Sequence, residues 1–312
     1  MTHMTRRLML LDSASLYFRA FYGVPDRRSG PDVMPTNAIR GFLDMIATLV
    51  NDHCPTDLVA CWDNDWRPAF RVDAIPSYKA HRLTEGATVE EDSPENLTPQ
   101  VPYIVSLLAA LGIPRVGADG YEADDVIGTL VHTHLGGCPV DVVTGDRDLF
   151  QLVDDQASVR VLYTARGGVR DPDLIDQSTL QEKYLVPTGR SYAEMAMLRG
   201  DASDGLPGVA GIGEKTAAAL LAQYGDLARL RAAVANGDPQ LKGARRTRLE
   251  AASGYLDVAP LVVNVALDVP LPDALDTRLP TQVADQDLLD RISSEIDINT
   301  PLRRALAALN LG

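Results

Sequence analysis

The feature that most constrains the fold is an alternation of short apolar segments with longer segments of helical periodicity. Apolar segments of strand length occupy residues 6–12, 57–63 and 159–163, and another opens the stretch 139–150. Segments whose apolar residues recur every three or four positions lie between them, at 13–22, 37–53, 101–113 and 121–135. This pattern predicts an α/β fold in which helices cover both faces of a mainly parallel central sheet. Ser13 is the expected N-cap of the first helix.

The chain is predicted to have two parts. Residues 6–185 contain the strand-like segments and form the α/β core, whereas residues 186–312 are mainly helical. Within the second part, residues 206–225 have the pattern of a helix–hairpin–helix, 269–280 form a proline-rich connector, and 299–309 form a short final helix. The polar, acidic segment 83–100 is predicted to be a mobile insertion.

Composition excludes several classes of protein. The 312 residues contain no run of about 18 apolar residues, so no transmembrane helix or membrane partner is expected. The N-terminus lacks the apolar stretch of a signal peptide. Three widely spaced cysteines fit neither a disulfide framework nor a zinc site. We therefore expect a cytoplasmic protein.

The net charge of −14, taken alone, favours a soluble acidic enzyme over a nucleic-acid-binding protein. Net charge hides its distribution, however, and the stretch KGARRTR at 242–248 is basic. A solvated helix face is the simpler interpretation of this stretch. The alternative is a patch that contacts DNA phosphates through Lys242, Arg245 and Arg246.

Aspartates end or follow three of the predicted strands. Asp12 and Asp63 stand at two strand ends, and Asp146 and Asp148 follow a third. Because ligands of an open α/β sheet bind at the carboxyl ends of its strands, these four carboxylates are expected to converge on one edge. Taken singly, each has a simpler explanation: Asp12 as a helix cap, and Asp146 and Asp148 as turn residues.

The stretch YEADD, residues 121–125, places three further carboxylates at the start of a predicted helix. Glu122 and Asp125 are three residues apart and share a helical face, whereas Asp124 points elsewhere unless the first turn is irregular. A favourable charge at a helix N-terminus is the simpler explanation of Glu122. Asp201 and Asp204 repeat the three-residue spacing just before the hairpin.

Convergence of these acids would require a cation. Two like charges about 4 Å apart repel by about 4 kcal/mol at an effective dielectric constant of about 20. Hard divalent cations such as Mg²⁺ or Mn²⁺ prefer oxygen ligands. So many acids suit two ions about 4 Å apart, the arrangement used in phosphoryl transfer.

The hairpin is a candidate phosphate-binding site. In GVAGIGEKTA the glycines Gly208, Gly211 and Gly213 permit a tight turn. The helix expected to follow presents its free N–H groups to the turn, and Lys215 and Thr216 add side-chain donors. An ordinary helix–turn–helix corner is the alternative.

The segment FRVDAIPSYKAHR, residues 70–82, is a second candidate for DNA binding, with Arg71, Tyr78, Lys79 and Arg82. Lys79 and Arg82 are three residues apart and are predicted to share a helical face that can contact a phosphate. A solvated surface helix is the alternative.

Together these stretches resemble the bacterial 5′-nuclease, or flap endonuclease, family, which also forms the N-terminal nuclease domain of bacterial family-I DNA polymerases. Six motifs over about residues 8–265 occur in the family's order: LLDSASLYFRAFY, CWDNDWRPAFR, SYKAHR, YEADDVIGTL, VTGDRDLFQLV and LRGDASDGLPGVAGIGEKTAAALL. Six ordered motifs are far more specific than any one of them. Gly205 departs from the family, which usually has asparagine after SD.

The resemblance implies a resolvase-like core with a helical arch at about residues 70–100 and a helix–hairpin–helix DNA-binding region. It implies flap endonuclease and 5′→3′ exonuclease activity on flapped, nicked or 5′-recessed DNA, including RNA-tipped strands, in replication and repair. Two or more divalent ions, Mg²⁺ or Mn²⁺, are implied cofactors. The implied metal ligands are Asp12, Asp63, Glu122, Asp124, Asp125, Asp146, Asp148, Asp201 and Asp204.

The resemblance also assigns basic residues. Lys79 and Arg82 are implied to be catalytic together with Asp146 and Asp148, and Arg19 and Tyr78 to contact the scissile or adjacent phosphate. The hairpin residues Gly211, Gly213, Lys215 and Thr216 are implied to grip the duplex backbone with a K⁺ ion. We expect a monomer.

Two other functions remain open on the sequence. One is a non-catalytic protein that binds DNA structures, and the other is a PIN-type ribonuclease with a similar acidic pocket. The hairpin argues against the ribonuclease.

Overall fold

The computed structural model describes residues 6–30, 32–88, 90–134, 137–272 and 274–312. Six strands form one sheet: β1 Leu8–Asp12, β2 Asp57–Cys61, β3 Arg115–Val116, β4 Val140–Thr144, β5 Val159–Tyr163 and β6 Asp173–Ile175. The helices of the first half are α1 Ser13–Gly23, α2 Asn37–His53, α3 Ala69–Ala74, α4 Val101–Leu111 and α5 Ala123–His134. Those of the second half are α6 Gln177–Tyr184, α7 Gly189–Arg199, α8 Glu214–Tyr224, α9 Leu227–Ala235, α10 Gly243–Ala251, α11 Ser253–Val263, α12 Gln286–Glu295 and α13 Asn299–Ala308. Four 3₁₀ helices are η1 Ala80–Arg82, η2 Thr98–Gln100, η3 Asp148–Leu152 and η4 Ala202–Asp204.

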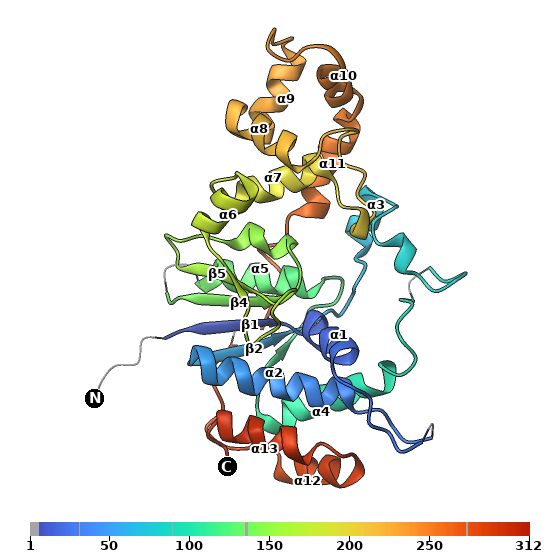
Figure 1. Cartoon of the computed structure of the whole chain (residues 1–312), viewed down its shortest axis with the longest axis vertical. Coiled ribbons are helices and arrows are strands. Elements are labelled where there is room, and N and C mark those ends of the chain that lie inside the picture. The colour runs from blue at the N-terminus through green and yellow to red at the C-terminus, as the bar shows by residue number, and fades with distance from the viewer. Residues whose placement is uncertain (1–5, 31, 89, 135–136, 273) are drawn as a thin grey trace.

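The sheet has the order β3-β2-β1-β4-β5-β6, and its neighbouring strands are parallel except for β5 and β6. Side chains of β1 alternate between two apolar cores. Leu8 and Leu10 pack on the face that α5 covers, and Met9 and Leu11 pack on the face that α2 and α4 cover (Figure 1). Both faces are therefore buried, as expected for a mainly parallel sheet. The predicted fold class is confirmed.

Local signals placed several helices correctly. α2 spans the predicted residues 37–53, and α4 ends at Gly112, whose φ of 78° is the left-handed conformation typical of a helix C-cap. The predicted cap of α1 is wrong. Asp12 caps this helix, because its carboxylate accepts the N–H of Ser15 at 3.1 Å.

The segment between α3 and α4 differs from the predicted helical arch, and its predicted mobility stays a prediction. Among its described residues (75–88 and 90–100), only the 3₁₀ helices η1 and η2 are helical, so the expected helical arch is not seen. The acidic part folds back as a tight turn, in which a β-bridge joins Leu83 to Glu91 and the N–H of Thr84 donates to Glu90.

The C-terminal residues return to the α/β core. The connector runs along the start of β2, where the N–H of Leu58 donates to Thr277 and that of Leu279 donates to Thr56. Helices α12 and α13 then pack against α4 and α2, at the opposite end of the molecule from α8–α10 (Figure 1). The helical DNA-binding part predicted at 186–312 is thus spatially continuous only up to α11. The α12–α13 pair completes the core instead.

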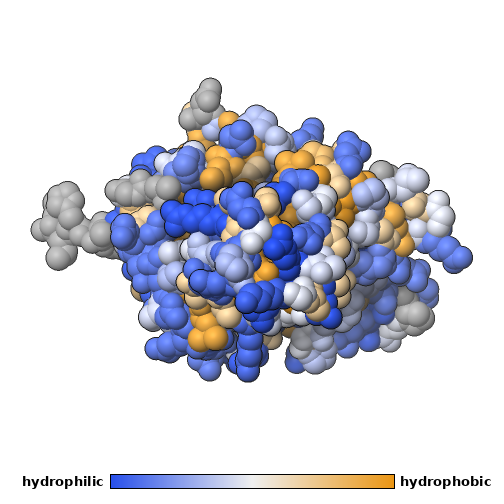
Figure 2. Space-filling model, turned by 90° about the horizontal axis from the view of Figure 1, so that it is seen from above, coloured by the Kyte–Doolittle hydropathy of each residue, from blue (hydrophilic) through white to orange (hydrophobic). Residues whose placement is uncertain are grey.

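The end of the molecule formed by α8–α10 is mixed in polarity. Figure 2 shows hydrophilic side chains over much of this face, with apolar side chains in scattered patches. Within the described ranges, no helix is long and apolar enough to span a membrane.

Candidate functional site

A cavity of about 370 Å³ opens at the carboxyl ends of the strands. The order β2-β1-β4 brings three acids to this edge: Asp63 two residues after β2, Asp12 at the end of β1 and Asp146 two residues after β4. The cavity is lined by Asp12, Ala14, Ser15, Tyr17, Phe18, Asp63, Asn64, Trp66, Lys79, Arg82, Glu91, Glu122, Asp124, Gly145 and Asp146. The sheet topology thus produces the convergence that the strand-end aspartates predict.

Asp12 and Asp63 are fixed by hydrogen bonds at the floor of this cavity. The hydroxyl of Thr144 donates to Asp12 at 2.6 Å, and the N–H of Ala123 donates to Asp63 at 2.8 Å. Burial raises the pKa of Asp12 to about 7 and that of Asp63 to about 6. Burial, followed by the negative charges of neighbouring acids, also raises the pKa of Asp124. Carboxylates gathered in this way favour either protons or a shared cation.

A buried arginine offsets the repulsion among the carboxylates of the YEADD stretch. Arg71 is 2% exposed, and its guanidinium ion-pairs with both Glu122 and Asp125. Its two Nη atoms lie 2.6 and 2.8 Å from the two oxygens of Asp125. The prediction that Arg71 contacts DNA is therefore wrong for this structure, because every face of the guanidinium is enclosed by protein.

Asp124 and Asp125 lie opposite to the prediction from helical spacing, which placed Asp125 at the site and Asp124 away from it. Asp124 lines the cavity, whereas Asp125 lies behind it, fully buried. Both oxygens of Asp125 are occupied, since they also accept the N–H groups of Glu122 and Ala266. Glu122 directly precedes α5 and its carbonyl accepts the N–H of Val126, so Glu122 and Asp125 lie on one side, where both contact Arg71. The structure therefore contradicts the prediction that Asp125 ligates a metal.

Lys79 and Arg82 both line the cavity, but they do not do so from one face of an α-helix, as predicted. Lys79 has a left-handed conformation, with φ 48°, just before η1, and its backbone N–H donates to Asp204 at 2.9 Å. Its ammonium pairs with Glu122, and the guanidinium of Arg82 lies 2.7 Å from Asp204. Both cations thus line the acidic cavity. Tyr78 is buried and donates its hydroxyl to Glu122 at 2.7 Å, so it does not present a free surface to DNA.

The remaining predicted acids lie beside the cavity. The N–H of Asp148 donates to Asp146 at 2.9 Å, and burial together with the charges of Asp146, Asp204 and Asp201 raises the pKa of Asp148. Asp201 is the N-cap of η4, and Asp204 is its last residue. Across the described chain, no three acidic, histidine or cysteine side chains converge closely enough to hold a metal ion directly.

Gly205 makes the contact between η4 and the Lys79 segment possible. Its φ is 71°, and an added Cβ would lie 2.1 Å from the carbonyl oxygen of Ser77. Asparagine tolerates the left-handed conformation, but no side chain fits this space. Gly205, in place of the family's asparagine, therefore lets the backbone of η4 approach the backbone at Ser77 very closely.

The hairpin after η4 leads into α8 as predicted. Gly213 is the N-cap of α8 without a side-chain cap, and no atom lies within 4 Å of where its Cβ would be. Gly208 and Gly211 have positive φ values of 63° and 68°. Lys215 is exposed, and no ion pair within the described residues includes it. The free N–H groups of α8 thus face open space.

Two residues at these sites were not predicted individually, although Arg248 belongs to the basic stretch 242–248. Glu91, from the acidic turn, lines the cavity near Lys79 and Arg82. Arg248 of α10 lies over the hairpin, since its Nη1 is 2.4 Å from the position of a Cβ on Gly211. The other predicted basic residues lie on the surface: Arg19 is half-buried, Lys242 and Arg245 are exposed, and Arg246 pairs with Glu250.

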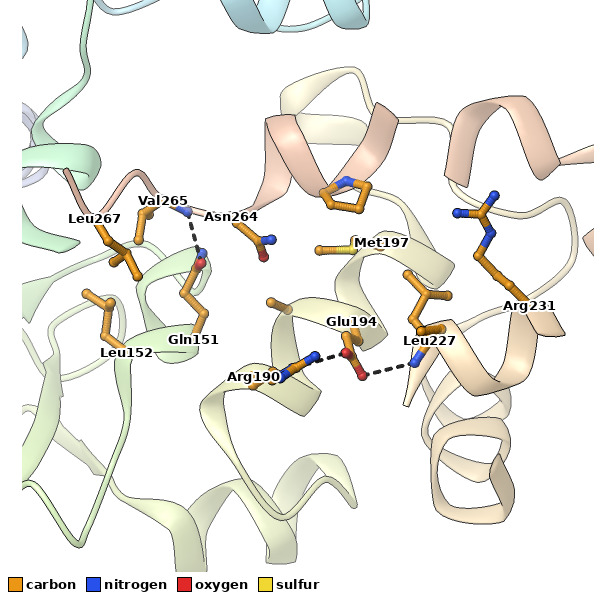
Figure 3. Close-up of a pocket in the computed structure, with 13 residues that line it drawn as sticks. Gln151, Leu152, Arg190, Glu194, Met197, Leu227, Arg231, Asn264, Val265 and Leu267 are labelled. Atoms are coloured by element: carbon orange, nitrogen blue, oxygen red, sulfur yellow. Dashed lines mark hydrogen bonds and ion pairs between the residues drawn. The ribbon is translucent and has the colours of Figure 1, made fainter. Parts of the chain in front are cut away.

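A larger cavity, of about 630 Å³, lies where α7 and α9 meet the end of α11 (Figure 3). Its walls are mainly apolar, with Met197 and Leu227 among them, and its buried acid, Glu194, accepts bonds from Arg190 and the N–H of Leu227. Gln151 joins this cavity to the acidic site, because its amide donates to the carbonyl of Asp148 at 2.8 Å. Only one acid lines this cavity, so it is not a second metal site.

Comparison with known proteins covers nearly the whole chain. Residues 7–185 match the family model described as "5'-3' exonuclease, N-terminal resolvase-like domain", and residues 187–287 match "5'-3' exonuclease, C-terminal SAM fold". A protein named 5'-3' exonuclease from Streptomyces coelicolor is 55% identical over 304 residues, covering 96% of this chain and 99% of that protein. A protein of the same name from Mycobacterium tuberculosis is 46% identical over 312 residues, covering 97% of this chain and 98% of that protein.

More distant similarities agree in fold. DNA polymerase I of Mycobacterium bovis is 39% identical over 298 residues, which are 93% of this chain but only 30% of the polymerase. The crystal structure of the T5 D15 protein with metal ions has a TM-score of 0.64 at 17% identity, covering 97% of this chain and all of that one. The catalytic core of Rad2 in complex with DNA substrate has a TM-score of 0.62 at 18% identity, covering 98% of this chain and 92% of that one.

Proposed function

Because this chain belongs to the 5'-3' exonuclease family, we propose that it is a structure-specific 5′ nuclease. In this proposal it hydrolyses phosphodiester bonds of flapped, nicked or 5′-recessed duplex DNA during replication and repair. The observation that carries the proposal is the cavity at the strand ends, where six carboxylates and two cations face one space.

The cavity residues fit hard divalent cations. Asp12, Asp63, Glu122, Asp124 and Asp146 supply oxygen ligands, and Asp148, Asp201 and Asp204 extend the set on one side. Mg²⁺ and Mn²⁺ keep several waters when bound, so carboxylates too far apart for direct ligation can hold them through water. When bound, such ions would activate a water for attack and stabilise the leaving oxygen.

The chain's own cations complete the chemistry. Lys79 and Arg82 line the same cavity as the acids, and each now has a carboxylate partner, Glu122 or Asp204. A phosphate that enters would compete with these carboxylates for Lys79 and Arg82, and the two side chains would then stabilise negative charge on the phosphoryl oxygens in the transition state. Partial enclosure strengthens such interactions, because the effective dielectric constant falls.

The hairpin and the α10 region would hold the duplex. The free N–H groups of α8, with Lys215 and Thr216, suit a backbone phosphate. Arg248 lies over the same turn. We also propose, from the family resemblance, that a K⁺ ion bridges the hairpin to DNA. We also propose that the protein acts as a monomer.

The test is cleavage of a 5′-flap substrate by Asp146→Asn. Asparagine keeps the oxygen that accepts the N–H of Asp148, so the fold should survive while the charge is lost. We expect cleavage with Mg²⁺ or Mn²⁺ to fall below detection. Asp287→Asn, an exposed change in α12 at the far end of the molecule, is the matched control. Full activity in Asp146→Asn would overturn the assignment.

A further inference from the structure

The loop at 164–172, which joins β5 to β6, is fixed to the same edge of the sheet as the acidic cavity. The N–H and the hydroxyl of Thr164 both donate to the carbonyl of Thr144, at 2.8 and 3.1 Å. The hydroxyl of Thr144 in turn donates to Asp12. A bond of 3.0 Å from the N–H of Gly168 to Thr164 closes the loop. The loop is therefore held rigidly, two hydrogen bonds away from the cavity floor.

This loop carries two exposed arginines and one acid, Asp171. Arg166 and Arg170 both face solvent. Arg19 of α1 reaches the loop, where its Nη1 donates to the carbonyl of Ala165 at 3.3 Å. Among all the ion pairs between described residues, none uses any of these three guanidiniums.

Exposed arginines without a carboxylate partner also occur elsewhere among the described residues, Arg291 and Arg303 included, whereas Arg71 and Arg304 have such partners. What distinguishes Arg19, Arg166 and Arg170 is their place at the edge of the sheet that carries the acidic cavity, in a chain with 43 acidic residues against 29 basic ones. Like charges gathered on one surface repel each other unless an anion binds there. The arrangement therefore fits a polyanion from outside the chain.

Arg147 extends this charge towards the hairpin. It lies between Asp146 and Asp148 in sequence and is partly exposed. Burial raises the pKa of Tyr163, and the positive charges of Arg147 and Arg166 counteract part of that rise, so both guanidiniums lie near this phenol. Arg147 follows β4, the strand next to β5, so it lies at the edge of the sheet that carries the loop, and its charge also acts on Glu214, the first residue of α8.

We propose that Arg166 and Arg170, continued by Arg19 and Arg147, form a basic surface that binds backbone phosphates of duplex DNA beside the cleaved strand. The inference rests on the proposed function and adds a second phosphate-binding region to the hairpin. The surface lies at the end of β5, beyond β4, and neither Arg166 nor Arg170 lines the acidic cavity. Its position therefore suits the duplex rather than a flap that enters the cavity.

The alternative role for these arginines is to offset the field of the acidic cluster. The two roles differ in one measurable quantity. Each phosphate contact contributes about 0.9 to the slope of log affinity against log salt concentration, because it releases counterions from the duplex. An arginine that only balances nearby acids contributes to stability but not to that slope.

The experiment compares Arg166→Gln/Arg170→Gln with Arg291→Gln/Arg303→Gln. The control pair is exposed, lies on α12 and α13 at the opposite end of the molecule and changes the net charge equally (Figure 1). Binding to a labelled nicked duplex is measured by fluorescence anisotropy from about 50 to about 200 mM KCl, with EDTA to stop cleavage. We expect the loop variant to lose about 2 from the salt slope. The ratio of the Kd of the loop variant to the Kd of the wild-type protein should then fall about tenfold across this range, and the same ratio for the control variant should not change.

Three outcomes would overturn the basic surface. In the first, the loop variant and the control variant have the same salt slope. In the second, the melting temperature of the loop variant falls but its salt slope stays that of the wild type. In the third, the loop variant loses as much salt slope on single-stranded DNA of equal length as it does on the duplex. Cleavage by the wild-type protein, measured separately with Mg²⁺ or Mn²⁺, distinguishes this inference from the proposed function. A changed slope without any wild-type cleavage would leave the basic surface standing and reject the nuclease.

Discussion

Removing the Arg71 guanidinium is the perturbation whose consequence follows most directly from the structure. Arg71 is 2% exposed and holds Glu122 and Asp125, which are also buried. Its Nε also donates to the carbonyl of Val262 at 3.0 Å, which ties the end of α11 to the floor of the site. Arg71→Met preserves much of the side-chain volume but leaves buried Asp125 without its cation and Glu122 with Lys79 alone.

Breaking one side of a buried ion pair costs about 3–5 kcal/mol, because the remaining charge is left uncompensated. We therefore expect the free energy of unfolding to fall by about 4 kcal/mol and the melting temperature by roughly 10 °C. Arg71→Lys should lose less, since it keeps the charge but not the fork that reaches both carboxylates.

The assay is urea unfolding followed by circular dichroism, with Arg304→Met as the matched control. Arg304 pairs bidentately with Asp44, but the two side chains are 53% and 38% exposed, so this pair should contribute no more than about 1 kcal/mol. The reasoning would be refuted if Arg71→Met destabilised the protein no more than Arg304→Met does.

Two further predictions concern the site. Gly205→Ala should lower the free energy of unfolding by more than about 2 kcal/mol and reduce cleavage, because its Cβ would lie 2.1 Å from Ser77 in a left-handed conformation. Gly254→Ala, at an open position in α11, should leave the free energy of unfolding unchanged in the same assay. Equal effects of the two changes would count against the close approach at Gly205. The folded-state pKa values of Asp12 and Asp63, raised to about 7 and about 6, mean that the metal-free protein binds extra protons when folded, so its stability should fall as pH rises from about 4 to about 7. Mg²⁺ binds the ionised acids, so the rise in melting temperature that it causes should be larger at pH 8 than at pH 5; an equal or smaller rise at pH 8 would contradict the raised pKa values.

Much of the fold is predictable because its signals are local. The apolar period and terminal glycine of α4, and the compact apolar run of β5, each lie within a single segment. β3 and β6 have two and three residues, too short for a pattern to emerge. The return of α12 and α13 to the core depends on contacts with α2 and α4, which local sequence does not encode.

The site was predictable where sheet topology alone decides it. Asp12, Asp63 and Asp146 follow strands that become neighbours, so they meet. The choice between Asp124 and Asp125 depends on where α5 begins and on a distant arginine, Arg71, which helical spacing cannot supply. Glu91 reaches the cavity through a turn whose sequence resembles an unstructured segment.

The central claim is that the acidic cavity is a metal-dependent nuclease site for DNA with a free 5′ strand. It is tested most directly by incubating the wild-type protein with end-labelled flap, nicked and RNA-tipped duplexes, and with an all-RNA flap, each with Mg²⁺, with Mn²⁺ and with EDTA. We expect cleavage of the DNA substrates near the junction, with 5′-phosphate and 3′-hydroxyl products, and none in EDTA. Flap binding without cleavage by either metal would contradict the claim and indicate a DNA-structure-binding protein, and cleavage restricted to the all-RNA flap would indicate a ribonuclease.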